Sequence, residues 1–216
     1  MLVGERMTRP VLFVAPETPV QDALAQMRKE RVSRYPVLNK KGKLVGIVSE
    51  DDLLNASPSD ATSLSVWEIN YLLSKITVER VMSKEVVTVT EDTPLEEAAR
   101  LMADNRIGGV PVLRGEEVVG MITQTDIFRV FLEMLGGRQS GWRVIVYVKN
   151  EKGILHRLTK AIDDIGGNII ALTTYAGQDI VDGEITMKVD QVDEATLRKA
   201  LEPFVNEIRD FREVKI

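Results

Sequence analysis

The sequence predicts an α/β (α+β) protein in which two β-α-β-β-α repeats form one module and a domain of ferredoxin-like β-α-β-β-α-β order follows. The first part rests on an internal repeat, because residues 5–38 align with residues 80–113 at a constant offset of 75 positions. The last third does not match the repeats and has its own sequence of strand-like and helical patterns. We therefore expect repeat 1 at 1–58, a linker helix at 59–76, repeat 2 at 77–136, a linker at 137–142 and the last domain at 143–216.

Each repeat opens with a β-rich stretch, VLFV at 11–14 or VVTV at 86–89, and continues into a helix that starts near a Thr-Pro pair. Threonine is a frequent N-cap and proline a frequent first helical residue, so we expect caps at Thr18 and Thr93, with capping boxes completed by Gln21 and Glu96. Apolar residues at helical spacing predict a buried face made of Val20, Ala23, Leu24 and Met27, or Leu95, Ala98, Ala99 and Met102.

Two strands and a second helix complete each repeat. The strands are YPVL and KLVGIVS in the first copy and VPVL and EVVGMIT in the second, joined by a Gly-containing turn. The second helix begins near a Ser/Thr-x-x-Asp motif, which spans Ser49 to Asp52 and Thr123 to Asp126. Such a motif is a variant of the helix capping box. It also suits a ligand, because a helix start favours an anion and a carboxylate accepts hydroxyl groups.

The segment between the repeats predicts one more helix. Ser65 and Glu68 form a possible capping box, and the helical pattern behind them includes Trp67 and Tyr71. We expect this helix to cover the module or a dimer seam, with a surface for a partner protein as the alternative.

The last third predicts strands at 142–150, 168–177, 182–190 and 212–216, with helices from 154 and over 193–204. The single histidine, His156, falls outside the apolar face that contains Ile154, Leu158 and Ile162. We expect it on the surface, with a ligand contact as the alternative.

Composition excludes several functional classes. A net charge of −5 argues against nucleic acid as a partner, since such binding needs a concentrated excess of Lys and Arg. No apolar run is long enough for a signal peptide or a membrane span, which predicts a cytoplasmic protein without membrane contact. With no cysteine and one histidine, the chain lacks a thiolate nucleophile and a Cys/His metal site, so we expect no enzyme, no catalytic residues and no metal.

The repeats resemble cystathionine-β-synthase (CBS) motifs, whose pair forms a Bateman module, through VSRYPVL with GIVSEDDL and IGGVPVL with GMITQTDI. Residues 143–216 resemble an ACT domain through VIVYVKNEKGIL and IGGNI. The tandem order and the segment ASPSDATSLSVWEINYLLSKI are similar to acetoin-utilisation proteins of the AcuB type.

The CBS resemblance implies no cofactor but a regulatory ligand, AMP, ADP, ATP or another adenosine compound, bound in clefts between the motifs. It implies that the Asp of each motif holds the ribose and that the Ser or Thr meets phosphate, which gives Ser49 and Asp52 in one cleft and Thr123 and Asp126 in the other. The segments before the PV strands would border adenine and phosphate, namely Val32, Ser33, Arg34, Ile107, Gly108 and Gly109.

The copies differ where Arg34 aligns with Gly109. We expect the cleft of Ser49 and Asp52 to bind phosphate better, because it has a guanidinium, and the other cleft to prefer an uncharged adenosine moiety or to stay empty. A surface ion pair of Arg34 is the alternative.

The ACT resemblance implies a ligand beside the loop after the first strand, often at a dimer seam. The matching residues are Asn150, Gly153, Ile154, Leu155 and Asn168. Lys152 stands where this family usually has proline, and Asn150 where it often has an acidic residue, so amino-acid binding and a purely dimerising role both stay open.

Together these patterns predict a non-catalytic, homodimeric regulatory sensor with an unidentified protein target and, by resemblance, a link to acetoin catabolism. A nucleotide in the CBS module would shift the population between two arrangements. The alternatives are an accessory subunit of an acetoin-cleaving enzyme and a dimerisation scaffold with empty clefts.

Overall fold

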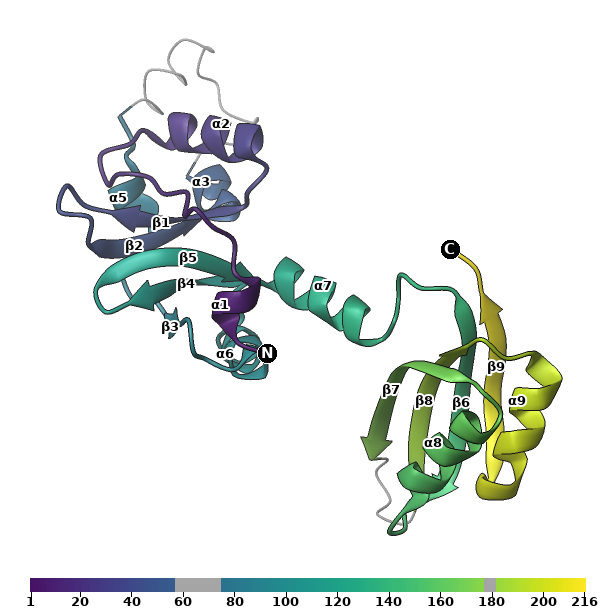
Figure 1. Cartoon of the computed structure of the whole chain (residues 1–216). Helices are drawn as coiled ribbons and strands as arrows, with labels where there is room; N and C mark the ends of the chain where they lie inside the picture. The colour runs from purple at the N-terminus through teal and green to yellow at the C-terminus, as the bar shows by residue number, and fades with distance from the viewer. Residues whose placement is uncertain (57–74, 177–181) are drawn as a thin grey trace. The chain divides into compact units, whose positions relative to one another are not determined.

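The computed structural model describes residues 1–56, 75–176 and 182–216 (Figure 1). The chain forms two compact units, Met1–Ile127 and Phe128–Ile216. The expected linker helix with Trp67 and Tyr71 lies outside the described residues.

The first unit contains both repeats. Its elements are α1 (Val3–Arg6), α2 (Val20–Glu30), β1 (Arg34–Leu38), β2 (Leu44–Ser49), α3 (Glu50–Asn55), α5 (Val78–Val81), β3 (Val89–Thr90), α6 (Leu95–Asn105), β4 (Gly109–Arg114), β5 (Glu117–Thr123) and the start of α7 (Gln124–Met134).

The two predicted hairpins form with the same register. In the first copy β1 and β2 are antiparallel and Arg34 lies opposite Ser49. In the second copy β4 and β5 are antiparallel and Gly109 lies opposite Thr123. This equivalence confirms the internal repeat and places the start of each PV strand next to the Ser/Thr-x-x-Asp motif.

The first segment of each repeat packs against the other repeat. After α1, Thr8 pairs with Met121 in β5 of repeat 2, and after α5, Ser83 pairs with Ile47 in β2 of repeat 1. Figure 1 shows α1 beside α6 and α5 beside α3. The repeats are therefore joined by a reciprocal exchange of short segments.

Glycines make room for this exchange. A Cβ at Gly46 would lie 2.5 Å from Sδ of Met82, and a Cβ at Gly120 would lie 2.5 Å from Sδ of Met7. Any larger residue at these two strand positions would collide with the methionine of the exchanged segment.

The starts of α2 and α6 differ from expectation. Pro19 and Pro94 are the N-caps, one residue later than predicted, and no side chain within the described residues caps either helix. The predicted caps and capping boxes are therefore wrong at Thr18, Thr93, Gln21 and Glu96.

Backbone carbonyls of the exchanged segments take over this role. The amide of Val20 donates to the carbonyl of Ile76 at 2.9 Å, and the amide of Leu95 donates to the carbonyl of Met1 at 3.0 Å. The first amides of a helix have no acceptor within the helix. Here a backbone carbonyl from a distant segment accepts the hydrogen bond that a threonine side chain was expected to accept.

The core of repeat 1 lies between α2 and the β1–β2 hairpin. Val20, Ala23 and Met27 are buried on the predicted face of α2. Tyr35 is fully buried, and its hydroxyl donates a hydrogen bond of 2.6 Å to Glu30 Oε2. Burial and this bond raise the pKa of Tyr35 well above its ordinary value of 10.0.

The second unit has the element order β-α-β-β-α-β. It contains β6 (Gly141–Lys149), α8 (Ile154–Asp164), β7 (Asn168–Ala176), β8 (Asp182–Asp190), α9 (Glu194–Leu201), the 3-10 helix η1 (Glu202–Phe204) and β9 (Glu207–Val214). The final strand begins earlier than the predicted 212. The strands form one antiparallel sheet of order β7-β8-β6-β9.

Helices α8 and α9 cover the same face of the sheet in the second unit (Figure 1). The core between helices and sheet includes Val144, Val146, Leu158, Ile162, Met187 and Leu201. His156 is exposed on α8, as its spacing predicts.

A buried lysine ties the end of α7 to this sheet. Lys188 is 5% exposed, and its Nζ donates a hydrogen bond of 2.8 Å to the carbonyl of Gly136. Burial lowers the pKa of Lys188. Gly136 has a φ of 59°, the left-handed conformation that commonly ends a helix.

We expect Tyr35→Phe to lower the free energy of unfolding by about 1.5 kcal/mol at pH 7, because it removes a buried hydrogen bond to a carboxylate. A pKa that is raised in the folded state contributes stability below pH 10 and loses it as the pH rises, because the unfolded tyrosine then ionises first. Urea unfolding of both proteins at pH 7 and at higher pH should therefore show a difference that shrinks above about pH 10.

Glu30→Gln is the control for this prediction, since it keeps an acceptor for the hydroxyl but removes the charge. A difference between wild type and Tyr35→Phe that is the same at pH 7 and at alkaline pH would contradict the prediction.

Candidate functional site

A cavity of about 460 Å³ lies between the two repeats of the first unit. Its volume is within the range of small-molecule sites. The residues that line it are Arg34, Ile47, Ser49, Asp51, Asp52, Ser83, Glu85, Val86, Val87, Arg106, Ile107, Gly108, Gly109 and Gln124.

The Ser/Thr-x-x-Asp motif is a complete capping box in the first copy. Asp52 Oδ2 accepts hydrogen bonds from the amide of Ser49 at 2.8 Å and from its hydroxyl at 2.6 Å. Ser49 Oγ in turn accepts from the amide of Asp52 at 3.2 Å. All three bonds use Oδ2 or Oγ, so the cap itself does not occupy Oδ1 of Asp52.

The second copy repeats this geometry. Asp126 Oδ2 accepts from the amide of Thr123 at 3.0 Å and from its hydroxyl at 2.6 Å. Asp126 is 7% exposed, whereas Asp52 is only partly buried. The motif therefore starts a helix in both copies, and Asp52 is the more accessible of the two carboxylates.

The cavity brings together motif residues of repeat 1 and the PV-strand segment of repeat 2. Six of the ten predicted nucleotide-site residues line it, namely Arg34, Ser49, Asp52, Ile107, Gly108 and Gly109. The other four are not among its lining residues, namely Val32, Ser33, Thr123 and Asp126.

Local packing accounts for two of these four. Val32 packs against the core of repeat 1. The carbonyl of Ser33 accepts the amide of Glu50 at 2.8 Å, so the backbone of Ser33 holds the start of α3. The carbonyl of Gly108 accepts the amide of Gln124 in the same way at 3.0 Å.

The sequence prediction missed the segment 83–87 of the cavity wall. Ser83, Glu85, Val86 and Val87 line the cavity because the residues after α5 cross to repeat 1 before they enter β3. The one available signal was that both repeats have a methionine before the first strand, at Met7 and Met82, and a glycine in the last strand, at Gly46 and Gly120. The structure shows why: each methionine lies against the glycine of the other repeat.

Arg34 reaches from repeat 1 to the glycines of repeat 2. A Cβ at Gly108 would lie 2.3 Å from its Nη2, and a Cβ at Gly109 would lie 3.1 Å from its Cδ. Burial lowers the pKa of Arg34, and the carboxylates of Asp51 and Asp52 oppose this shift. Nε is shielded from solvent and has no hydrogen-bond partner among the described residues.

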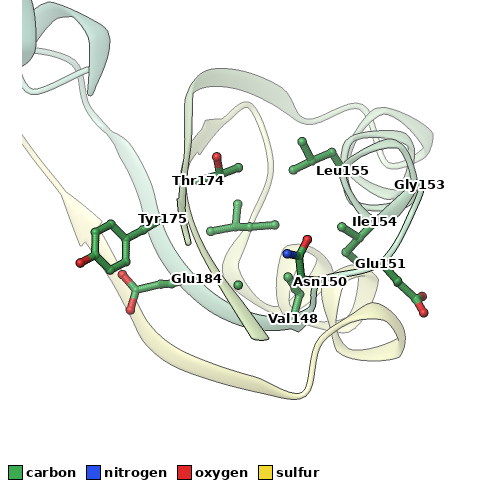
Figure 2. A pocket seen from close by; sticks show the side chains of 11 residues that line it. Val148, Asn150, Glu151, Gly153, Ile154, Leu155, Thr174, Tyr175 and Glu184 are labelled. Atoms are coloured by element: carbon green, nitrogen blue, oxygen red, sulfur yellow. The ribbon is translucent and has the colours of Figure 1, made fainter. Parts of the chain in front are cut away.

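A second cavity, of about 310 Å³, lies in the second unit between the loop after β6 and the ends of β7 and β8 (Figure 2). Four of the five residues predicted for this domain line it, namely Asn150, Gly153, Ile154 and Leu155. Figure 2 shows Asn150 pointing into the pocket and Glu151 pointing away from it.

Carboxylates at the rim of this second cavity are already paired. Glu151 accepts a short hydrogen bond from Arg157, and Glu184 forms an ion pair with Arg209 at 3.2 Å. The walls are mostly apolar and include Val148, Ile154, Leu155 and Ile185. The pocket thus combines an apolar interior with a polar rim.

The structure does not bring Asn168 to this cavity. Asn168 is the first residue of β7, whereas Thr174 and Tyr175 near the other end of that strand line the pocket. The side-chain Nδ2 of Asn168 donates a hydrogen bond of 2.8 Å to Asp190 Oδ1, which connects the start of β7 to the end of β8.

No cluster of three His, Cys, Asp or Glu side chains within the described residues has the geometry of a metal site. No helix in that part of the chain is both long and apolar enough to cross a membrane.

Comparison with known proteins assigns both repeats to one domain family. The sequence profile of the CBS domain matches residues 3–59 and 78–133. A protein of Methanocaldococcus jannaschii, MJ1426, is 31% identical over 155 residues, which cover 61% of this chain and 92% of that protein.

Solved structures agree with this match. The CBS domain pair of protein MJ0100, solved with 5′-methylthioadenosine and S-adenosyl-L-methionine, is 28% identical with a TM-score of 0.52 and covers 64% of this chain and 98% of that one. A Vibrio cholerae protein assigned to acetoin utilization (AcuB) is 27% identical with a TM-score of 0.53 and covers 64% of this chain and 96% of that one. The chain belongs to the CBS domain family, with two CBS domains in tandem.

Proposed function

We propose that this protein is a non-catalytic regulatory sensor that binds an adenosine-containing nucleotide in the cavity lined by Ser49 and Asp52. One observation carries the proposal: the cavity sets the Ser-x-x-Asp motif of repeat 1 against the PV-strand segment of repeat 2. The solved pair of MJ0100, which holds two adenosine compounds, supports this ligand class.

Three polar residues of the cavity have a role in this proposal, namely Asp52, Ser49 and Arg34. Asp52 accepts the ribose hydroxyls through the carboxylate oxygen that its cap does not use. Ser49 and Arg34 meet the phosphate, and Ile107 with Gly108 borders the base. The cap uses Oδ2 of Asp52 and the ligand would use Oδ1, so the same residue serves folding and binding without competition.

The second motif supplies a related site in the proposal. Thr123 and Asp126 would form it with Val32 and Ser33 by the equivalence of the two repeats. The position equivalent to Arg34 is Gly109, so this cleft prefers an uncharged adenosine moiety or stays empty.

We further propose that residues 143–216 are an ACT domain that binds a small molecule. The β-α-β-β-α-β order and the sheet order β7-β8-β6-β9 support this assignment. The cavity at Asn150 and Gly153 favours ligand binding over a purely dimerising role.

The proposal includes a cytoplasmic homodimer and an unidentified protein target. Exposed apolar side chains on α7 support a self-association surface, since Phe128 is 66% and Phe131 54% exposed. The similarity to the Vibrio cholerae protein supports a link to acetoin catabolism. We also propose boundaries at 1–58 and 77–136 for the repeats.

Regulation would follow from differential binding. A nucleotide that contacts both repeats favours the arrangement in which the two halves of the cavity are complete. This bias reaches the target only if the target binds the two arrangements with different affinity.

Asp52→Asn should weaken AMP binding by about 10-fold or more, because an amide retains the cap acceptor but loses the charged acceptor for the ribose. Asp126→Asn is the matched control, and it should leave the high-affinity AMP site unchanged. Isothermal titration calorimetry with AMP measures both. Equal AMP affinity for wild type and Asp52→Asn would exclude Asp52 from the site.

Gly183→Val should abolish ligand binding in the second cavity and leave the sheet folded. Gly183 lines the pocket, and a Cβ there meets Val148 at an ordinary 3.8 Å, so a larger side chain fills the cavity without backbone collision. Thermal shift across a panel of amino acids detects the ligand in wild type, with Thr173→Val on β7 as control. No shift with any amino acid in the wild type would favour the dimerising role instead.

A further inference from the structure

We propose that Arg34, seated on Gly108 and Gly109, makes the Ser49/Asp52 cavity selective for charge: it admits anionic adenosine 5′-phosphates and rejects cationic adenosyl sulfonium compounds. This inference rests on the proposed function, because it assumes that an adenosine ligand enters this cavity. It adds the chemical class of the ligand and the residue that decides it.

The seat of Arg34 depends on two consecutive glycines. Nη2 occupies space that a Cβ at Gly108 would fill, and Cδ lies close to where a Cβ at Gly109 would be. A side chain at either position would push the guanidinium away. The position of the guanidinium in the cavity therefore depends on the space that the two glycines of repeat 2 leave open.

The charge of Arg34 dominates the cavity because of where it lies. Asp51, Glu85 and Arg106 also line the cavity, but these three residues are exposed and water screens their charges. Arg34 is only partly exposed, so its field acts through a medium of lower effective dielectric constant. Asp52 is the remaining charged wall residue, and its Oδ2 already accepts two hydrogen bonds from Ser49.

The guanidinium is still able to donate. It has five N–H groups in a fixed plane, and Nε has no acceptor within the described part of the chain. A phosphate accepts two parallel hydrogen bonds from such a group. A sulfonium group at the place of this phosphate would instead meet the like charge of the guanidinium.

Charge selection by this residue is confined to one of the two motifs. The register of the repeats places Gly109 opposite Thr123 just as Arg34 lies opposite Ser49. The second motif therefore has no cation at the equivalent position. A cleft at the second motif would therefore differ from the Ser49/Asp52 cavity in its charge preference.

The test compares three probes of different charge: AMP, adenosine and S-adenosyl-L-methionine. Calorimetric titrations use the full chain with Asp126→Asn, so that the second motif does not contribute. Wild-type Arg34 should bind AMP most tightly and the sulfonium compound least. Arg34→Gly, which copies the residue at Gly109, should weaken AMP binding about 10- to 100-fold, strengthen sulfonium binding and leave adenosine affinity unchanged.

Two further variants separate charge from structure. Arg34→Lys keeps the charge but not the planar pair of donors, so it should weaken AMP less than Arg34→Gly and still reject the sulfonium compound. Gly108→Ala keeps Arg34 but displaces its guanidinium, so it should shift both affinities in the same direction as Arg34→Gly.

Each outcome bears on a distinct claim. Equal affinity of the unmodified Arg34 protein for AMP and the sulfonium compound would overturn the charge selection and leave the nucleotide site intact. A parallel loss of adenosine and AMP affinity in Arg34→Gly would show a structural role and likewise overturn it. Failure of all three probes to bind would instead reject the proposed function of this cavity.

Discussion

The reciprocal exchange of short segments between the repeats is the constraint on which the first unit depends. α1 completes repeat 2 and α5 completes repeat 1, and each segment supplies the carbonyl that satisfies the first amide of the opposite helix. Gly46 and Gly120 are small because methionines of these segments lie against them. Neither repeat has a finished helix start or a finished strand edge without the other. The cavity follows from this exchange, since its wall comes from both repeats.

The Ser/Thr-x-x-Asp motif shows how one local structure can serve folding and binding. The cap uses Oδ2 of the aspartate in both copies. At Asp52 the carboxylate also faces the cavity, whereas Asp126 is buried more deeply. The motif therefore caps a helix in the same way in both copies. The two copies differ in how accessible the aspartate is to a ligand. That inequality comes from the surroundings of the motif and not from its own residues.

Arg34 is the clearest case of a residue whose meaning depends on its surroundings. In the sequence Arg34 is one arginine among many, and it directly precedes the predicted strand YPVL. In the structure its side chain crosses to Gly108 and Gly109, and burial lowers its pKa while neighbouring carboxylates oppose the change. A buried Nε that has no acceptor among the described residues is costly to keep in a fold. Such a cost is consistent with a ligand that supplies the missing acceptor.

The sequence alone determined the elements that depend on local pattern. Strand alternation and helical spacing predicted both hairpins, the buried faces of α2 and α6 and the element order of the second unit, because these signals lie within one segment. The Ser49 and Asp52 cap was also readable. Tertiary structure alone decided the missing caps at Thr18 and Thr93, the entry of residues 83–87 into the cavity wall and the position of Asn168 outside the second cavity. These features rest on contacts between segments distant in the chain, and no local pattern encodes which distant partner a segment will meet.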